Sequence, residues 1–307
     1  MPANGQGFFA SKRRIEAARK SVALGVIVVL SVLMIIPLAW MLAISLKEPQ
    51  NVFQLPPWKV DWRWENYRDA WYIYGLPTLS GSFTEKVRAF FGERESFWWY
   101  LQNTLIITLS STLGSVLSAA VVAYGFARLR FMGRDVLFVI VISTMMVPAQ
   151  VTMIPTFILF SKLAWTNTFL PLIVPAWLGG GAYNVFLLRQ FFMTIPHDLD
   201  EAAKIDGCSP FGIFWRIMLP LSLPSLVTVS IFGIVWNWND FIGPLIYIQD
   251  SKLFTLSLGL NQFNSLYGNK THLLMAASTV VLLPILILFF VGQKYFIQGI
   301  VFTGVKG

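Results

Sequence analysis

A polar stretch between two long apolar runs carries the most specific residue spacing in this sequence. Asp198 followed three residues later by Glu201 has the spacing of a capping box, in which two side chains satisfy free backbone donors at a helix start. Gly207 suits the left-handed turn that ends a helix, and Ser209-Pro210 suits the start of a second helix. We therefore predict a helix, a sharp turn and a helix outside the bilayer. The residues expected to contact a partner there are Glu201, Ala202, Ala203, Asp206, Gly207, Leu219 and Pro220.

The chemistry of this stretch is docking rather than catalysis. A loop that is so closely specified is typical of a surface that another protein grips. An ordinary connection whose residues only cap two helices would have the same spacing, so both interpretations stay open on spacing alone.

A second polar group lies within an apolar run, at Trp236, Asn237, Trp238, Asn239 and Asp240. A carboxylate in the middle of a bilayer costs about 2.5 to 3.5 kcal/mol on insertion scales, so Asp240 is expected to face protein or water. Indole faces beside amides suit a sugar, which has apolar faces and a rim of hydroxyls. Gln150, near two prolines of an earlier apolar run, is a further candidate for the substrate pathway. Bonding to neighbouring helices is the alternative, because consecutive helical residues cannot all face one cavity.

Several other chemistries are excluded by the residues. The pattern G-x-x-x-x-G-K-[ST] is missing, so this chain cannot hydrolyse ATP by the phosphate-loop route. Cys208 is the sole cysteine, so no intrachain disulfide forms. His197 and His272 are predicted on opposite sides of a membrane. We therefore expect no catalytic residue, no metal site and no cofactor bound to this chain.

Composition predicts a protein that crosses a membrane several times. Of 307 residues, 56% are hydrophobic and 12% charged, and the mean hydropathy is +0.64. A helix needs roughly 20 apolar residues to cross the hydrocarbon core. We predict an all-α polytopic membrane fold with six transmembrane helices and a cytoplasmic helix-turn-helix coupling loop. The six apolar runs are Val22–Leu46, Trp99–Ala127, Val136–Phe160, Phe169–Leu188, Leu223–Ile248 and Leu273–Gly292.

The net charge is +8, and the distribution of the basic residues along the chain indicates membrane topology rather than nucleic-acid binding. A basic cluster precedes the first run and is expected to stay in the cytoplasm. With six spans, both termini are cytoplasmic. The predicted parts are a cytoplasmic segment 1–21, a transmembrane domain 22–293 and a cytoplasmic tail 294–307. Within that domain, an outer segment covers about 47–98 and the coupling loop covers about 189–222.

Prolines and aromatic residues add two local expectations. Pro148 and Pro155 are expected to kink the third span, because each removes a backbone donor. The outer segment is rich in aromatic residues, which fit either a belt at the headgroup level or a lateral patch that meets a substrate-delivering protein. They are Trp58, Trp62, Trp64, Tyr67, Trp71, Tyr72 and Tyr74.

The coupling loop resembles the E-A-A loop of bacterial ATP-binding-cassette (ABC) import permeases. Glu201-Ala202-Ala203 is followed after three residues by Gly207 and, after nine more, by Ile217-Met218-Leu219-Pro220. Tyr124-Gly125-Phe126-Ala127-Arg128-Leu129, Trp238-Asn239-Asp240-Phe241 and the tail Gln293-Lys294-Tyr295-Phe296 with Gly304-Val305-Lys306-Gly307 resemble the carbohydrate branch, in particular its maltose-permease-like second subunit. The resemblance runs from about Val28 to the C-terminus.

The resemblance implies function and partners. It implies a permease subunit of the bacterial inner membrane that moves a sugar or oligosaccharide inward by alternating access. The implied partners are a second homologous permease subunit, two ATPase subunits that use ATP and Mg²⁺, an extracellular or periplasmic solute-binding protein, the lipid bilayer and the sugar; nucleic acid is not among them. The alternatives are a permease of this kind for another small polar solute and an ion- or proton-coupled secondary transporter. A secondary transporter is expected to carry several intramembrane charges or an internal repeat, and Asp240 is the one clear candidate charge.

Overall fold

The computed structural model describes residues 5–54, 58–71, 97–265 and 270–304, which form helices and connections without a strand. The prediction of an all-helical fold is confirmed. The chain divides into two compact units, Met1–Ala70 with Asn269–Thr279 and Trp71–Gly268 with Val280–Gly307. Each unit is described by itself.

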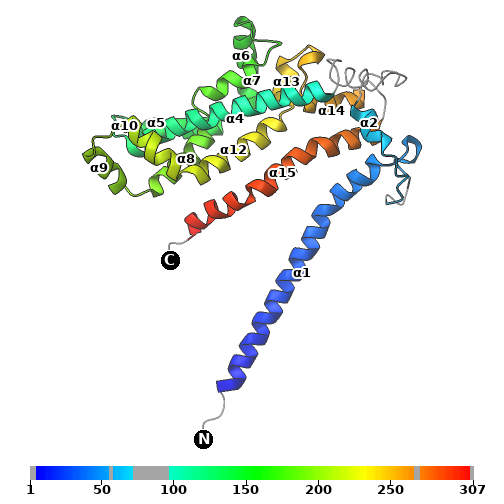
Figure 1. Cartoon of the computed structure of the whole chain (residues 1–307), viewed down its shortest axis with the longest axis horizontal. Coiled ribbons are helices and arrows are strands. Elements are labelled where there is room, and N and C mark those ends of the chain that lie inside the picture. Colours follow the sequence, from blue (N-terminus) through cyan, green and yellow to red (C-terminus); the bar gives the residue numbers. More distant parts are fainter. Residues whose placement is uncertain (1–4, 55–57, 72–96, 266–269, 305–307) are drawn as a thin grey trace. The chain divides into compact units, whose positions relative to one another are not determined.

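The first unit is dominated by α1 (Gly5–Ser45; Figure 1), which contains the first predicted span except its last residue, Leu46. Its apolar side chains are exposed on all sides, from Val22 to Leu42, and none lies buried in its most apolar window. A helix that is apolar all round is typical of a lipid-facing or partner-facing span. Short elements follow, namely the 3-10 turn η1 (Pro49–Asn51) and α2 (Glu65–Trp71).

Hydrogen bonds to the backbone organise the turn after α1. Lys47 is 1% exposed, and its Nζ donates to the Gln54 carbonyl at 3.0 Å. The buried Asn66 amide donates to the carbonyls of Ser45 at 2.9 Å and Lys47 at 2.8 Å. The Asp61 carboxylate accepts the Glu48 N–H at 2.9 Å and the amide of Asn51, and these bonds hold the pKa of Asp61 below its ordinary 3.8. Protonation of Asp61 at lower pH therefore weakens this turn.

This ordered turn presents aromatic side chains outward. Trp58, Trp62 and Trp64 are exposed, and the rings of Trp62 and Trp64 lie 6.4 Å apart. Trp62 has a φ of 56°, which is unusual for a bulky residue. Tyr72 and Tyr74 lie outside the described residues, as does the outer segment between 72 and 96. The choice between an aromatic belt and a protein-binding patch stays a prediction.

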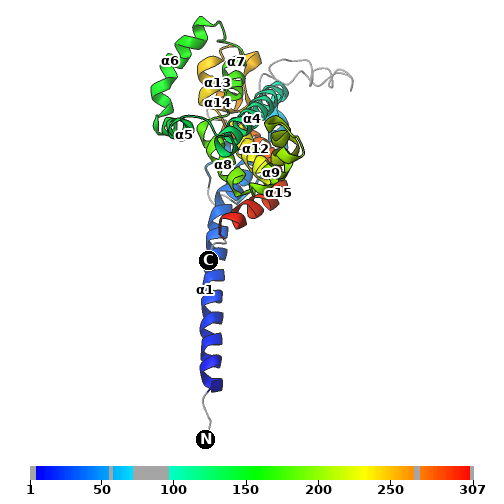
Figure 2. The same cartoon turned by 90° about the vertical axis from the view of Figure 1, so that its left-hand side faces the viewer.

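The second unit is built around α4 (Phe97–Arg128), which agrees with the second predicted span. Figures 1 and 2 show α8 (Ala182–Thr194) and α12 (Leu223–Trp238) packed along it. One face of α4 is apolar and exposed. Its residues include Leu105, Leu109, Leu113, Leu117 and Val121.

Away from this face, α4 carries a stripe of polar side chains, in which Ser111, Ser115 and Ser118 are spaced three or four residues apart as one helix face requires. Ser111 Oγ donates to the Leu172 carbonyl at 2.7 Å, Ser115 Oγ to Gly180 at 2.8 Å and Ser118 Oγ to Ala176 at 3.0 Å. Near the other end, the Asn103 amide donates to the carbonyls of Lys252 and Phe254, and Thr104 Oγ1 accepts the Leu256 N–H. These side chains satisfy backbone groups that irregular segments leave free. We call this set of α4 side chains the polar stripe; its members are Asn103, Thr104, Ser111, Ser115 and Ser118.

The third predicted span, Val136–Phe160, is broken rather than kinked. It consists of α5 (Arg134–Ser143), the 3-10 turn η2 (Thr144–Met146) and α6 (Ala149–Lys162), and the two parts meet at 97°. The break falls at Val147–Pro148, where Val147 is extended, as the residue before a proline prefers to be. The interruption predicted at Pro148 is confirmed, whereas Pro155 stays inside α6 without ending it.

Irregular backbone also interrupts the fourth predicted span. This span contains α7 (Leu170–Ile173), the 3-10 turn η3 (Val174–Trp177) and then α8. Gly180 has a φ of 68°, and a Cβ there would collide with the Ser115 carbonyl and with Ala119. Glycine is therefore required for both conformation and close approach to α4.

The fifth predicted span, Leu223–Ile248, is wrong as a continuous helix. α12 ends at Trp238 and α13 covers Ile242–Tyr247. The remaining elements are the 3-10 turn η5 (Ser251–Leu253), α14 (Leu256–Ser265) and α15 (Thr271–Gly304), which contains the sixth predicted span. Among the described residues, four helices are long and apolar enough to cross a membrane, or up to six if each bent helix pair is one span.

Replacing Asn66 is expected to loosen the turn after α1. Asn66→Ala leaves the buried carbonyls of Ser45 and Lys47 without this donor, which costs about 1 to 3 kcal/mol. The Arg63 amide, which bonds the Leu46 carbonyl at 2.9 Å, reports the opening of this turn by hydrogen exchange. Asn51→Ala is the matched control, because its amide makes one exposed bond and its loss is expected within about 0.5 kcal/mol. Equal exchange in both variants would contradict this account.

Candidate coupling loop and substrate pathway

The first half of the coupling loop is a short helix with a closed C-terminal end. α9 spans Asp198–Ile205, and Gly207 follows with a φ of 80°. The Cys208 N–H bonds the Ala203 carbonyl at 2.9 Å, and the Gly207 N–H bonds the Lys204 carbonyl at 3.0 Å. This pair of bonds is a Schellman motif, which uses a left-handed residue to stop a helix. The prediction that Gly207 ends this helix is confirmed.

The second half begins at the predicted Ser209-Pro210 start. Ser209 Oγ accepts the Gly212 N–H at 3.2 Å, and α10 covers Pro210–Ile213. A π-helical turn, η4 (Phe214–Met218), and α11 (Leu219–Leu221) continue it. The prediction of helix, sharp turn and helix is confirmed.

The tip of this loop is an exposed surface with an apolar rim. Ile205 is 88% exposed, and Phe211 and Trp215 are also exposed. Phe211 and Trp215 line a concave surface together with Asp206, Gly207 and neighbouring residues. Of the predicted contact residues, Glu201, Ala202, Asp206, Gly207 and Pro220 are exposed, Leu219 is half-buried and Ala203 is buried. Ala203 therefore packs in the core beneath the surface.

A buried ion pair holds the base of α9 to the end of α4. Arg128 Nη1 lies 3.2 Å from Asp200 Oδ2, and the two side chains are 1% and 8% exposed. Arg128 Nη2 also donates to the carbonyls of Phe192 and Ile195, both at 2.6 Å. Its Nη1 lies 2.9 Å from His197 Nδ1. One guanidinium thus connects the ends of α4 and α8 with the start of α9.

A second contact joins α4 to the other half of the loop. Tyr124 lies one helical turn before Arg128, and its hydroxyl donates to the Pro210 carbonyl at 3.0 Å. The rings of Tyr124 and Phe214 lie 5.1 Å apart. The Tyr-Gly-Phe-Ala-Arg sequence at the end of α4 therefore supplies a polar attachment to each half of the coupling loop.

The predicted capping box at Asp198 was wrong. α9 begins at Asp198 itself, His197 is the residue before the first helical turn, and no side chain caps it. The His197 carbonyl accepts the N–H groups of Asp200 and Glu201 instead. Arg128 holds the entering chain through Ile195 and His197, so tertiary contacts rather than a local cap determine this helix start. Sequence reasoning missed Asp200, although its position within the acidic first turn offered a signal.

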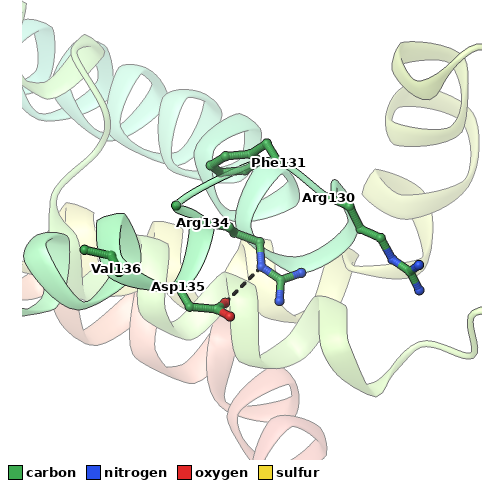
Figure 3. Close-up of a pocket in the computed structure, with 6 residues that line it drawn as sticks. Arg130, Phe131, Arg134, Asp135 and Val136 are labelled. Carbon is green, nitrogen blue, oxygen red and sulfur yellow. Dashed lines mark hydrogen bonds and ion pairs between the residues drawn. The ribbon is translucent and has the colours of Figure 1, made fainter.

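The turn after α4 carries exposed positive charge. Figure 3 shows Arg130, Phe131, Arg134, Asp135 and Val136 around a shallow pocket. Arg134 Nε lies 2.9 Å from Asp135 Oδ1 in an exposed pair. Such pairs contribute little stability.

Three of the predicted pathway residues are buried or half-buried and bond within the chain. The Asn237 amide donates to Thr112 Oγ1 at 3.3 Å and to the Gly233 carbonyl at 2.8 Å. The buried Trp238 Nε1 donates to the Val281 carbonyl at 3.2 Å. Asp240 Oδ1 accepts the Gly243 N–H at 3.1 Å and so supports the start of α13. These contacts fit the structural alternative for these residues.

The other predicted pathway residues face outward. Trp236 is 79% exposed, and Asn239 and Gln150 are exposed. The Asn239 amide donates to the Val235 carbonyl of its own helix. The structure therefore does not gather the predicted pathway residues in one cavity, and their contact with substrate stays a prediction. Within the described part of the chain, no three His, Cys, Asp or Glu side chains are grouped to hold a metal ion.

Comparison with known proteins places this architecture in a family. Residues 115–301 match the family described as "Binding-protein-dependent transport system inner membrane component". The arabinooligosaccharide transport permease AraQ of Halalkalibacterium halodurans is 38% identical over 217 residues, 71% of this chain and 77% of that protein. The diacetylchitobiose uptake permease DasC of Streptomyces coelicolor is 29% identical over 282 residues, 91% and 95% of the two chains. A chain in the crystal structure of a bacterial ABC transporter involved in alginate import matches with a TM-score of 0.72 at 21% identity, over 96% of this chain and 100% of that one. The chain belongs to the inner membrane components of binding-protein-dependent transport systems.

Proposed function

We propose that this membrane component moves a sugar or oligosaccharide into the cytoplasm by alternating access, as one of two homologous permease subunits. Two ATPase subunits, which bind the ATP and Mg²⁺, drive the movement by docking on the coupling loop. A solute-binding protein outside the membrane delivers the substrate. The observation that carries the proposal is the coupling loop, an exposed helix-turn-helix surface held firmly on α4.

The geometry of the loop supports docking of a protein. The apolar side chains of Ile205, Phe211 and Trp215 are exposed at its tip, and Phe211 and Trp215 line a concave surface. Aromatic residues are favoured anchors of protein interfaces. The Schellman end at Gly207 and the Ser209 cap fix the backbone before a partner arrives, so less ordering entropy is lost on binding.

Sugar as the substrate class is supported by the relatives. The names of two similar permeases specify arabinooligosaccharides and diacetylchitobiose. These are different sugars, so we propose the class and leave the individual sugar to experiment. Exposed aromatic and amide groups such as Trp236 and Asn239 fit the apolar faces and hydroxyl rim of a sugar.

We propose six spans with both termini in the cytoplasm of a bacterial cell. The six are the four long apolar helices, the bent segment of α5, η2 and α6, and α12, which continues from the coupling loop. The basic cluster in the N-terminal part of α1, before its apolar run, together with Arg130 and Arg134 after α4, then lies on the inner side, as the positive-inside rule favours. The coupling loop lies on that side as well.

Substitution of Gly207 tests the coupling role. Gly207→Val places a β-branched residue in a left-handed turn, a strain of about 1 to 3 kcal/mol, whereas no atom lies within 4 Å of the added Cβ to clash with it. We expect a loss of about tenfold or more in solute-stimulated ATP hydrolysis by the reconstituted transporter. Gly207→Asn is the matched control, because Asn tolerates this conformation. Wild-type stimulation in the Val variant would end the coupling interpretation.

Thiol labelling tests the orientation. Cys208 is the only cysteine and lies in the coupling loop. An impermeant maleimide is expected to leave Cys208 unlabelled in intact cells and to label it after permeabilisation. Cys208→Ser provides the background signal. Labelling from outside in intact cells would reverse the proposed topology.

Uptake measurements test the substrate class. Cells that carry the complete transporter are expected to accumulate at least one radiolabelled oligosaccharide from a panel that includes arabinooligosaccharides and diacetylchitobiose. Cells that lack this chain provide the control. Uptake of a non-sugar solute alone would keep the transport function and overturn the sugar assignment.

A further inference from the structure

The buried Arg128–Asp200 ion pair lies where the coupling loop meets a membrane-spanning helix, so it can transmit movement as well as stabilise the fold. It joins the coupling loop to α4, the helix whose polar stripe holds the irregular segments of the second unit. We infer that this pair is the joint through which movement of α9 is transmitted to α4. The inference rests on the proposed coupling function and adds the route inside this chain.

The ion-pair joint is stiff because the planar guanidinium of Arg128 is buried and makes several hydrogen bonds. Arg128 contacts Asp200, His197 and the carbonyls of Phe192 and Ile195. A guanidinium offers five donors in a fixed plane, so it resists rotation in a way that a single ammonium does not. Removing Asp200 would leave a buried charge without its counterion, which is far more disruptive than loss of an exposed pair.

A second attachment removes the remaining freedom of the loop. Tyr124 and Arg128 lie one turn apart on α4, roughly 6 Å along its axis, and hold α10 and α9 respectively. Either polar contact alone would fix one point of the loop, beside the apolar packing of Ala203, Ile213 and Phe214. Two contacts, one on each side of Gly207, make the loop and the end of α4 move together.

The backbone that leads from the coupling loop to α12 is more flexible than the ion-pair contact. Between α10 and α12 the chain passes through the π-helical turn Phe214–Met218, and the helices on either side of Ser222 meet at 77°. π-turns and sharp bends interrupt the regular hydrogen-bond ladder of a helix. Displacement of the loop is therefore carried more directly by the buried ion pair than along the chain.

Amide hydrogen exchange of the assembled transporter in nanodiscs tests this route. Exchange is compared with and without trapping of the ATPase subunits by ATP plus orthovanadate, so no sugar is needed. In the wild type, trapping is expected to change exchange in α9 and in residues 118–128 of α4. In Asp200→Asn, the change in α9 is expected to persist, and the change in α4 is expected to fall by about tenfold, within the range typical of coupling between two sites.

Three further variants distinguish transmission of movement through the ion pair from a general stabilising role of the pair. Asp200→Glu keeps the carboxylate and is expected to restore most of the α4 response. Asp135→Asn removes the acid of the exposed Arg134–Asp135 pair and is expected to respond like the wild type. Tyr124→Phe loses one hydrogen bond and is expected to show a smaller loss, which gives a second measurement if Asp200→Asn assembles poorly.

The outcomes separate this inference from the proposed function. An undiminished α4 response in both Asp200→Asn and Tyr124→Phe would overturn the joint and leave coupling through the loop intact. A wild-type transporter in which trapping changes neither α9 nor α4 would overturn the coupling function itself.

Discussion

Satisfying the backbone without water is the constraint on which this structure depends. In hydrocarbon every N–H and C=O group needs a partner within the protein, and a regular helix supplies these partners locally. The chain nevertheless contains breaks, at Val147–Pro148, around Gly180 and between α12 and α13. The polar stripe of α4 meets part of this need, since Ser115 and Ser118 bond carbonyls around the second break. α4 therefore serves as both a span and a template for its irregular neighbours.

The same helix links the membrane and the coupling loop. Its exposed leucines suit lipid, its polar stripe suits broken segments, and its last turn carries Tyr124 and Arg128. Contact with lipid, support of the broken segments and attachment of the loop need separate faces or ends of the helix. The 32 residues of α4 are long enough to provide them. The contacts with α8 and α12 along its length make these functions mechanically dependent on one another.

The sequence predicted correctly the elements whose structure depends on residues close together in the chain. The bounds of α4 followed from one mainly apolar run without proline or charge before Arg128, and the turn at Gly207 followed from the conformational freedom of glycine. The fifth span was predicted too long because Asn237 and Asn239 bond carbonyls within their own helix and Asp240 caps the next one. The pairing of Arg128 with Asp200 depends on two helices meeting in space, which spacing along the chain does not reveal.

The exposure of α1 has an evolutionary consequence. Because the apolar window of α1 buries no residue within this chain, exchange of one aliphatic residue for another there leaves the packing of the described residues unchanged. Selection on this stretch then acts through hydrophobicity and through whatever surface touches it from outside the chain. We expect aliphatic identity in α1 to drift quickly among relatives. The Asn66 turn that follows it, with its specific hydrogen bonds, has far less freedom to vary.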